Sequence, residues 1–321
     1  IQFYFLVIMM LASMVACKKE EYTIPDPVSL LTNDCIKRTI GPSIVSLPLE
    51  FAYAMAIPKS SGKLVSAQVE ASIAGASGTY LEHRSFYTNS GGVDVPVLVG
   101  SPSLTVDKTT KMTYSIDTNA ATLRYNYVIP EGARGQSVSF TFSVTSSDGK
   151  TASYKMGPYT ISKMSINRNL AVSNGVNAYI SIEDMAVYNA AAAAATPGKI
   201  DLVYLFRAAP TTFTHALVSP AADAAYLPGV TLPAGLNRST KLRKVFNLQD
   251  RNLANLQFGI YVDDVDLINV DMVDMPNYAI GLRAEAGVWV ETADKKYRAY
   301  IFVNSINAAG TAVISMLRYT L

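Results

Sequence analysis

The sequence has few of the residue types that build disulfide frameworks, zinc sites and catalytic triads. Its 321 residues include only two cysteines and two histidines, and His83 and His215 each stand alone in the sequence. A structural zinc site uses clustered Cys and His ligands, and a triad needs a nucleophile brought to a histidine and an acid. No Gly-x-Ser-x-Gly motif marks such a nucleophile. We therefore predict no catalytic residues, no cofactor and no enzymatic activity.

Charge is also scarce, and the two signs nearly balance. Only 16% of the residues are charged, and the net charge is +2. Nucleic-acid binding favours a clustered basic surface, so we predict no nucleic-acid partner. The glycine pairs at Gly91-Gly92 and at Gly132 and Gly135 lack the Lys-Ser/Thr that completes a phosphate-binding loop.

Long apolar runs are missing except at the start of the chain. Phe3 to Ala16 contains only one strongly polar residue, Ser13. This run is too short to span a bilayer, which needs about 20 apolar residues, and it has the length of the apolar part of a secretory signal. The chain opens on Ile1 without a basic segment, so we expect the sequence to begin a few residues inside the signal. We predict a signal peptide over residues 1–16.

The end of this run resembles the lipobox of bacterial lipoproteins. The matching residues are Met14-Val15-Ala16-Cys17, and the resemblance implies cleavage before Cys17 and attachment of lipid to its sulfur. Lys18 to Glu21 is similar to the export signal of surface lipoproteins in Bacteroidetes-type bacteria. The resemblance implies an outer-membrane protein that faces the cell surface, with the membrane as a partner through the lipid. Residues 17–32, which include two prolines, are expected to form an extended tether, and Cys35 is left without a partner.

The body of the chain is rich in tyrosine and in alternating apolar patterns, which indicates β-structure. The pattern predicts a first domain over residues 33–163, with strands over residues 47–57, 65–73, 123–129 and 137–145. Ser147-Asp148-Gly149-Lys150 predicts a hairpin turn, and the short strands suggest a β-sandwich. The segment from Gly135 to Tyr159 resembles the closing hairpin of bacterial immunoglobulin-like modules, which implies an immunoglobulin-like fold.

A second β-rich domain is predicted over residues 164–321. It begins with a polar connection over residues 164–177, and Asn189 is expected to cap a short helix over Ala190 to Ala195. Asp250 is expected to cap a helical turn at residues 251–256. Further strands are predicted at residues 179–182, 200–206, 257–262, 288–290, 297–303 and 312–319. We predict a jelly-roll-like sandwich with one or two short helices, and an α+β layer fold is the alternative.

Aromatic residues are the strongest hint of a binding site. Tyr80, Phe86 and Tyr87 crowd a loop-like stretch before Gly91-Gly92, and Trp289 is the only tryptophan. Exposed rings on a rigid β surface suit the flat faces of sugars, whereas buried rings are simply part of the core. We take these four residues as candidate ligand-binding aromatics.

An acidic stretch raises the alternative of a calcium site, since calcium takes oxygen ligands. It lacks the glycine and the final glutamate of an EF-hand, and apolar residues alternate with its acids, as in an amphipathic strand or turn with a solvated acidic side. We therefore predict no metal, and keep calcium as an alternative at Asp263, Asp264, Asp266, Asp271 and Asp274.

The lipidated cysteine, the tether and two β domains together resemble the accessory surface lipoproteins of Bacteroidetes-type bacteria. Residues 51–56, 67–72, 199–204 and 259–264 are similar to an uncharacterised lipoprotein family of that group, a domain of unknown function. That resemblance assigns no activity and no site residue. We expect a non-catalytic protein that binds a glycan or another extracellular polymer. The alternatives are a structural or adhesive component of a surface protein assembly and, less favoured, a hydrolase.

Overall fold

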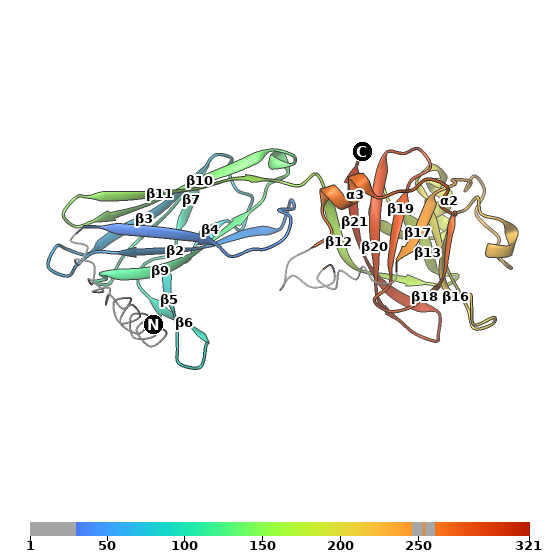
Figure 1. Ribbon diagram of the computed structural model, residues 1–321, viewed down its shortest axis with the longest axis horizontal. Coiled ribbons are helices and arrows are strands. Elements are labelled where there is room, and N and C mark those ends of the chain that lie inside the picture. The colour runs from blue at the N-terminus through green and yellow to red at the C-terminus, as the bar shows by residue number, and fades with distance from the viewer. Residues whose placement is uncertain (1–29, 246–252, 254–260) are drawn as a thin grey trace, which may run out of the picture.

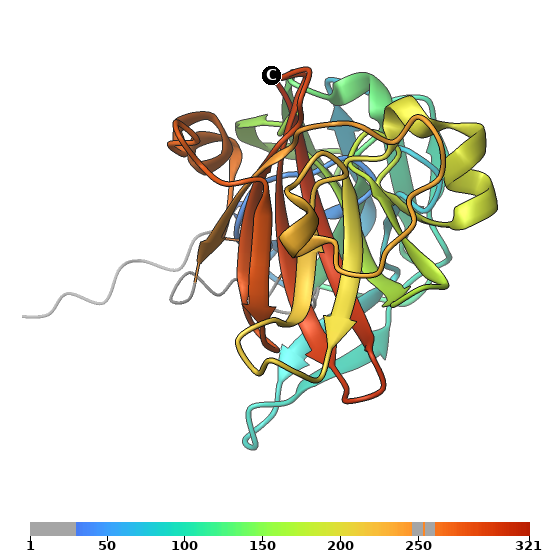
Figure 2. The same ribbon diagram turned by 90° about the vertical axis from the view of Figure 1, so that its right-hand side faces the viewer.

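The computed structural model describes residues 30–245, 253 and 261–321. The predicted signal, Cys17 and nearly all of the tether lie outside these residues, as does most of the predicted turn and strand over residues 251–262. The described residues fold into two β-sandwiches placed end to end (Figures 1 and 2). None of their helices is both long enough and apolar enough to span a bilayer.

The first sandwich consists of two antiparallel sheets. One sheet has the order β1 (Thr32–Lys37), β2 (Pro48–Ala56), β9 (Ala120–Val128) and β4 (Tyr80–Leu81). The other has the order β11 (Thr151–Thr160), β10 (Ser137–Ser146), β3 (Leu64–Ala71), β8 (Thr109–Thr113) and β7 (Leu104–Val106). The short helix η1 (Glu131–Ala133) lies between β9 and β10, and a separate hairpin is formed by β5 (Arg84–Thr88) and β6 (Asp94–Leu98).

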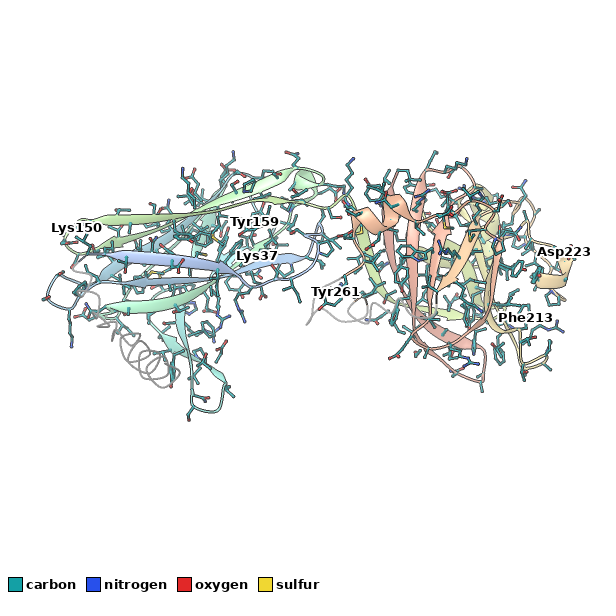
Figure 3. All side chains as sticks on the ribbon, viewed as in Figure 1. Lys37, Lys150, Tyr159, Phe213, Asp223 and Tyr261 are labelled. Carbon is teal, nitrogen blue, oxygen red and sulfur yellow. The ribbon has the colours of Figure 1, made fainter. Side chains whose placement is uncertain are left out.

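Alternating apolar residues build the core of this sandwich, as the sequence predicts. Phe51 and Tyr53 of β2 face Phe140 and Phe142 of β10, and all four side chains are buried. The Phe140 ring centroid lies 4.9 Å from that of Phe51, within the range at which aromatic pairs add stability beyond burial. The predicted hairpin turn at residues 147–150 is confirmed. At the surface, the Lys37 ammonium lies 5.7 Å from the ring centroid of Tyr159 (Figure 3).

The second sandwich also has two antiparallel sheets, of five strands each. One has the order β12 (Ser165–Ser173), β21 (Thr311–Thr320), β20 (Tyr297–Ile306), β19 (Gly287–Glu291) and β17 (Lys241–Val245). The other has the order β14 (Ala186–Asn189), β13 (Asn177–Ser181), β15 (Leu202–Arg207), β16 (Thr214–Val218) and β18 (Tyr278–Leu282). Side chains from both sheets share one core, so the second domain is a β-sandwich and not an α+β layer fold.

The helices of this domain are short. The predicted helix is α2 (Ala190–Ala195), and Asn189 caps it, since the Asn189 Oδ1 accepts a hydrogen bond of 2.9 Å from Ala192 N. A second helix, α3 (Asp264–Asn269), lies in the acidic stretch, where a strand or turn was predicted. Single 3-10 turns are η2 (Pro197–Lys199) and η3 (Ala224–Tyr226).

The prediction of a polar connection over residues 164–177 is wrong, because Ser165–Ser173 forms strand β12 and pairs with β21. This strand lies at the edge of its sheet, where outward side chains can be polar, while Val172 is buried in the core. Asn169 has a φ of 58°, and the register of the pairing shifts between Asn167 and Leu170. This bulge interrupts the apolar alternation that would have identified the strand.

Asp201 is a buried charge just before β15, with 1% of its surface exposed. Its Oδ2 accepts a hydrogen bond of 2.9 Å from Ile182 N, and its Oδ1 lies 2.9 Å from the Nε of Arg238. Arg238 also lies 3.0 Å from Asp294. Burial raises the pKa of Asp201 to about 6, although the hydrogen bond from Ile182 and the charge of Arg238 oppose the shift.

The two sandwiches are held together by a shared apolar cluster and by hydrogen bonds. Ile44, from the segment before β2, is fully buried in a cluster with Met164 and Trp289 of the second sandwich. Arg134 Nη1 donates a hydrogen bond of 2.7 Å to Met164 O. The Asp264 carboxylate of α3 accepts hydrogen bonds from Ser162 Oγ and Lys163 N. Residues 161–164 between β11 and β12 are therefore fixed on both sides.

Cys35 is a buried free thiol in β1. Burial, followed by the nearby charge of Asp34, raises the pKa of Cys35 to about 12. Since the thiolate is the reactive form of cysteine, Cys35 is a packing residue of the first core.

Candidate binding groove

The stretch that carries Phe86 and Tyr87 is a hairpin, not the loop that its sequence suggests. Strands β5 and β6 pair with each other and project from the first sandwich (Figure 1). Asn89 builds the turn, because its Oδ1 accepts hydrogen bonds of 3.0 Å from both Gly91 N and Val93 N. Gly92 has a φ of 76°, a conformation that glycine adopts without steric cost. The aromatic residues are thus carried by an ordered element.

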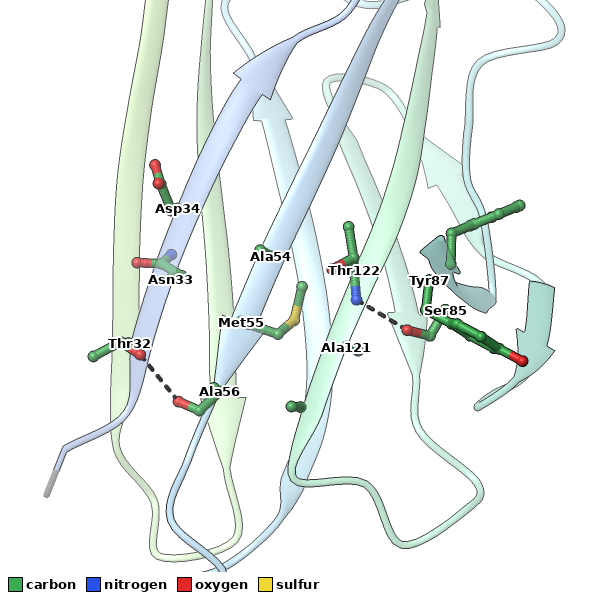
Figure 4. A pocket seen from close by; sticks show the side chains of 12 residues that line it. Thr32, Asn33, Asp34, Ala54, Met55, Ala56, Ser85, Tyr87, Ala121 and Thr122 are labelled. Carbon is green, nitrogen blue, oxygen red and sulfur yellow. Dashed lines mark hydrogen bonds between the residues drawn. The ribbon is translucent and has the colours of Figure 1, made fainter. Parts of the chain in front are cut away.

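Strand β9 fixes the base of this hairpin. The Ser85 Oγ accepts a hydrogen bond of 3.0 Å from Thr122 N (Figure 4). Arg124 of β9 forms an ion pair with Asp94 of β6. The Arg124 guanidinium carbon also lies 4.9 Å from the ring centroid of Phe86, a cation–π contact that contributes about 0.5–2 kcal/mol. These contacts set the angle at which the hairpin leaves the sheet.

A groove of about 460 Å³ lies between the hairpin and the sheet that contains β1, β2 and β9 (Figure 4). Its floor is flat because outward positions of β2 and β9 carry small side chains, among them Ala54, Ala56 and Ala120. Phe86 and Tyr87 line the side formed by the hairpin. The side formed by β1 carries Thr32, Asn33 and Asp34. Thr32 and Asp34 are exposed, whereas the Asn33 amide is turned toward the core of the sandwich. An aromatic wall facing polar groups is typical of sites that bind small polar ligands.

The described residues that line this groove include one carboxylate and no histidine. That carboxylate is Asp34, whose Oδ1 accepts a hydrogen bond of 2.7 Å from Cys35 N. Asn33 points its amide inward and donates to the Tyr53 hydroxyl at 2.9 Å. Glycoside hydrolysis requires two carboxylates that flank the scissile bond. The described lining of the groove therefore has one carboxylate where this chemistry would use two.

The two histidines lie in different domains and neither lines the groove. His83 Nδ1 is 3.2 Å from Glu82 Oε1, and Arg84 lies 2.6 Å from the same carboxylate. Hydrogen bonding to Arg84 is the largest influence that lowers the pKa of Glu82. His215 is buried in the second sandwich and its Nδ1 lies 2.6 Å from the hydroxyl of Tyr204.

Two of the four candidate aromatics lie elsewhere. Trp289 is only 5% exposed, and its ring centroid lies 4.7 Å from that of Tyr300 in the cluster between the domains. The prediction that Trp289 contacts a ligand is therefore corrected: β19 is an interior strand, and this side chain packs against the covered face of its sheet. Tyr80 is 45% exposed on β4 but does not line the groove.

The acidic stretch forms the start of helix α3. Asp263 Oδ1 accepts hydrogen bonds from Val265 N and Asp266 N, while Asp266 Oδ2 accepts one from Asp263 N, which completes a capping box. Asp264 binds the linker between the domains, and Asp271 caps Val273 N at 2.9 Å. Across residues 30–245, 253 and 261–321, no three His, Cys, Asp or Glu side chains, Asp274 included, group as metal ligands.

Comparisons with known proteins place both sandwiches in families. The model of a domain of unknown function (DUF4466) matches residues 28–161, and that of a second domain of unknown function (DUF8576) matches residues 162–321. A crystal structure of a DUF4466 family protein from Parabacteroides merdae is 48% identical to this chain, with a TM-score of 0.86. The similarity covers 92% of this chain and all of the other. The chain belongs to the DUF4466 family.

The family membership agrees with the uncharacterised Bacteroidetes family that the sequence resembles, and the groove lies wholly within the DUF4466 region. The major pilin subunit of Bacillus cereus is 8% identical, with a TM-score of 0.29; the similarity covers 88% of this chain and 62% of that one. That likeness is too low to carry an argument. A search of the functionally curated proteins gives no match.

Proposed function

We propose that this DUF4466 protein is an outer-membrane lipoprotein, displayed at the cell surface through lipid on Cys17, that binds a glycan or another extracellular polymer without cleaving it. The observation that carries the binding role is the groove with its alanine floor, its aromatic wall and its single carboxylate. An immunoglobulin-like first sandwich would be the module next to the membrane, since β1 begins 15 residues after Cys17, a span of at most about 50 Å.

Replacing Cys17 with alanine is expected to release the protein from the membrane. The variant has no sulfur to acylate, and the short apolar run before it is too short to hold a protein in a bilayer as a span. Fractionation of cells together with labelling by an acyl-chain analogue measures the effect. Cys35→Ala is the matched control, because that thiol is buried in the first core, and this variant should keep both its label and its membrane location. A Cys17→Ala protein that remains acylated in the membrane fraction contradicts the proposed anchor.

Replacing Tyr87 with alanine is expected to weaken glycan binding about tenfold or more, because removing a central aromatic contact of an interface costs about 1–2 kcal/mol or more. The full chain and its variant are compared on a glycan array, and the affinities of array hits are measured by calorimetry. Tyr80→Ala is the matched control, since Tyr80 is 45% exposed, Tyr87 is 55% exposed, and only Tyr87 lines the groove.

Equal losses in Tyr87→Ala and Tyr80→Ala would place the ligand outside the groove and contradict its role. An array on which the full chain binds nothing above background would overturn the glycan proposal. The better interpretation would then be a structural or adhesive component of a surface assembly.

A further inference from the structure

A second cavity, of about 990 Å³, opens at one end of the second sandwich. It is lined by the segment between β15 and β16, by the segment between β20 and β21, and by the end of β18. Phe213, at the end of the β15–β16 segment, marks this part of the molecule in Figure 3. The cavity shares no residue with the groove of the first sandwich.

One wall of this cavity is an aromatic surface held in a fixed position. The ring centroids of Phe206 and His215 are 4.6 Å apart. The His215 Nδ1 lies 2.6 Å from the Tyr204 hydroxyl, and burial lowers the pKa of His215. Gly310 packs beneath Phe206 with a φ of 79°, and a Cβ at that position would lie 2.9 Å from the Phe206 ring. The glycine therefore allows the ring to lie against the β20–β21 segment.

The opposite wall is cationic. Lys244 and Arg283 both line the cavity, and none of the described residues of its lining is an aspartate or glutamate. Lys244 Nζ donates a hydrogen bond of 2.6 Å to Ile280 O, which fixes the ammonium at the wall. Arg283 is exposed and makes no ion pair with a described residue. Thr211, Thr212 and Asn307 add neutral hydrogen-bonding groups at the rim.

We propose that this cavity is a binding site for a sugar that bears a carboxylate, such as a uronic or sialic acid residue. Arg283 is the residue expected to bind the carboxylate, because a guanidinium matches the two oxygens of a carboxylate in a bidentate pair. Phe206 supplies a flat apolar surface for the carbon face of the ring, and the threonine and asparagine side chains can bind its hydroxyls. A neutral sugar would leave the Arg283 guanidinium without a carboxylate to bind, so the site discriminates by charge.

The site goes beyond the proposed glycan-binding groove, because it lies in the other domain and selects another feature of the ligand. In Figures 1 and 2 the β5–β6 hairpin and the β20–β21 segment both point to the same side of the molecule. A single long acidic polymer can therefore contact both sites along that side. Once one site has bound the polymer, the other site meets it at a high effective concentration, which raises the overall affinity.

The test is a calorimetric titration of the full chain with trigalacturonate and sialyllactose, and with methyl-esterified trigalacturonate and lactose as uncharged matches. We expect at least one acidic sugar to bind and its neutral match to bind at least tenfold more weakly. Arg283→Ala is expected to weaken the acidic interaction about tenfold, as for the loss of a hydrogen bond to a charged group. Arg243→Ala is the matched control, because Arg243 is an exposed arginine one residue from Lys244 that contacts Asp271 O instead of the cavity.

Three results would overturn the proposal: neither acidic sugar binds at millimolar concentration, the neutral match binds equally well, or Arg283→Ala binds as the unmodified chain does. Tyr87→Ala separates this site from the groove. It should leave binding of the short acidic sugars unchanged, and a loss of their binding in that variant alone would assign them to the groove and refute the second site.

Discussion

Replacing Arg238 with methionine is expected to lower the free energy of unfolding of the second sandwich by about 3–5 kcal/mol at pH 8. Breaking a buried ion pair on one side leaves an uncompensated charge, and this is among the costliest single substitutions. The Asp201 carboxylate would keep its hydrogen bond from Ile182 N but lose the guanidinium 2.9 Å away. The substitution also removes the contacts of Arg238 with Asp294 and with Gly198 O.

The effect should depend on pH in a defined direction. The pKa of Asp201 in the folded chain, about 6, lies above the unfolded value of about 3.9. The folded state therefore binds the Asp201 proton more tightly than the unfolded chain does. The stability gained from this tighter binding is fully present below about pH 4 and is lost as the pH rises through 6. Removing Arg238 takes away a charge that opposes the shift, so the pKa rises further. We expect the loss to be smaller at pH 5 than at pH 8 by up to about 2.7 kcal/mol, which is about 1.36 kcal/mol for each of the two pH units between 6 and 8.

Urea denaturation followed by tryptophan fluorescence measures this loss. Trp289 is the only tryptophan in the chain and is buried in the cluster that the two domains share, so its signal reports on the second sandwich and on its contact with the first. This matters because a chain with two domains need not unfold in one step. Arg243→Met, an exposed arginine on β17, is the control and should change stability by less than about 0.5 kcal/mol. Equal losses at pH 5 and pH 8 would refute the assignment of the effect to Asp201.

Replacing Phe140 with alanine is expected to destabilise the first sandwich by about 3–5 kcal/mol, the usual cost of removing a buried phenylalanine. The ring lies at the centre of the aromatic core, with centroids 4.9 Å from those of Phe51 and Tyr127 and 6.0 Å from that of Tyr125. Strands from both sheets hold these rings, so the surrounding backbone cannot close around the cavity without breaking strand pairing.

Hydrogen exchange resolved by peptide shows where this loss occurs. Peptides from β2, β9 and β10 should exchange faster in Phe140→Ala, while those from β15 and β16 should keep their protection. Ser139→Ala is the matched control, because this neighbouring side chain lies outside the core and is partly buried. Protection in Phe140→Ala that equals that in Ser139→Ala would show that the core relaxes around the missing ring.

The sequence predicts the elements whose local pattern has a single physical cause. Strands β2 and β10 alternate because one face of each packs on the same core. Helix α2 is predicted because Asn189 supplies a cap and six alanines follow it. Strand β12 is missed because it is an edge strand with a bulge at Asn169. Helix α3 had a readable signal, since Asp263 and Asp266 have the spacing of a capping box.

The candidate groove is predictable only in part. Phe86 and Tyr87 stand out as a local cluster of aromatic residues, and both line the groove. Its floor and far side come from β1, β2 and β9. Strand β9 begins at Ala120, far along the chain from the end of β2 at Ala56. Only the pairing of the strands brings these together, and no local pattern encodes that. The same limit explains Trp289, which is buried in a cluster that includes Ile44 of the other domain.

The order of the strands also determines how the molecule would carry a mechanical load. Strand β1 pairs with β2 antiparallel, from Thr32 opposite Ala56 to Lys37 opposite Phe51. The residues just before β2 pack against the second sandwich, so Thr32 lies at the end away from that domain. A pull between the proposed attachment at Cys17 and a ligand bound at the proposed site of the second sandwich would therefore run along β1. Its hydrogen bonds to β2 are loaded together in shear, instead of one after another as in peeling. A protein held at one end and pulled at the other would resist detachment most strongly in this direction.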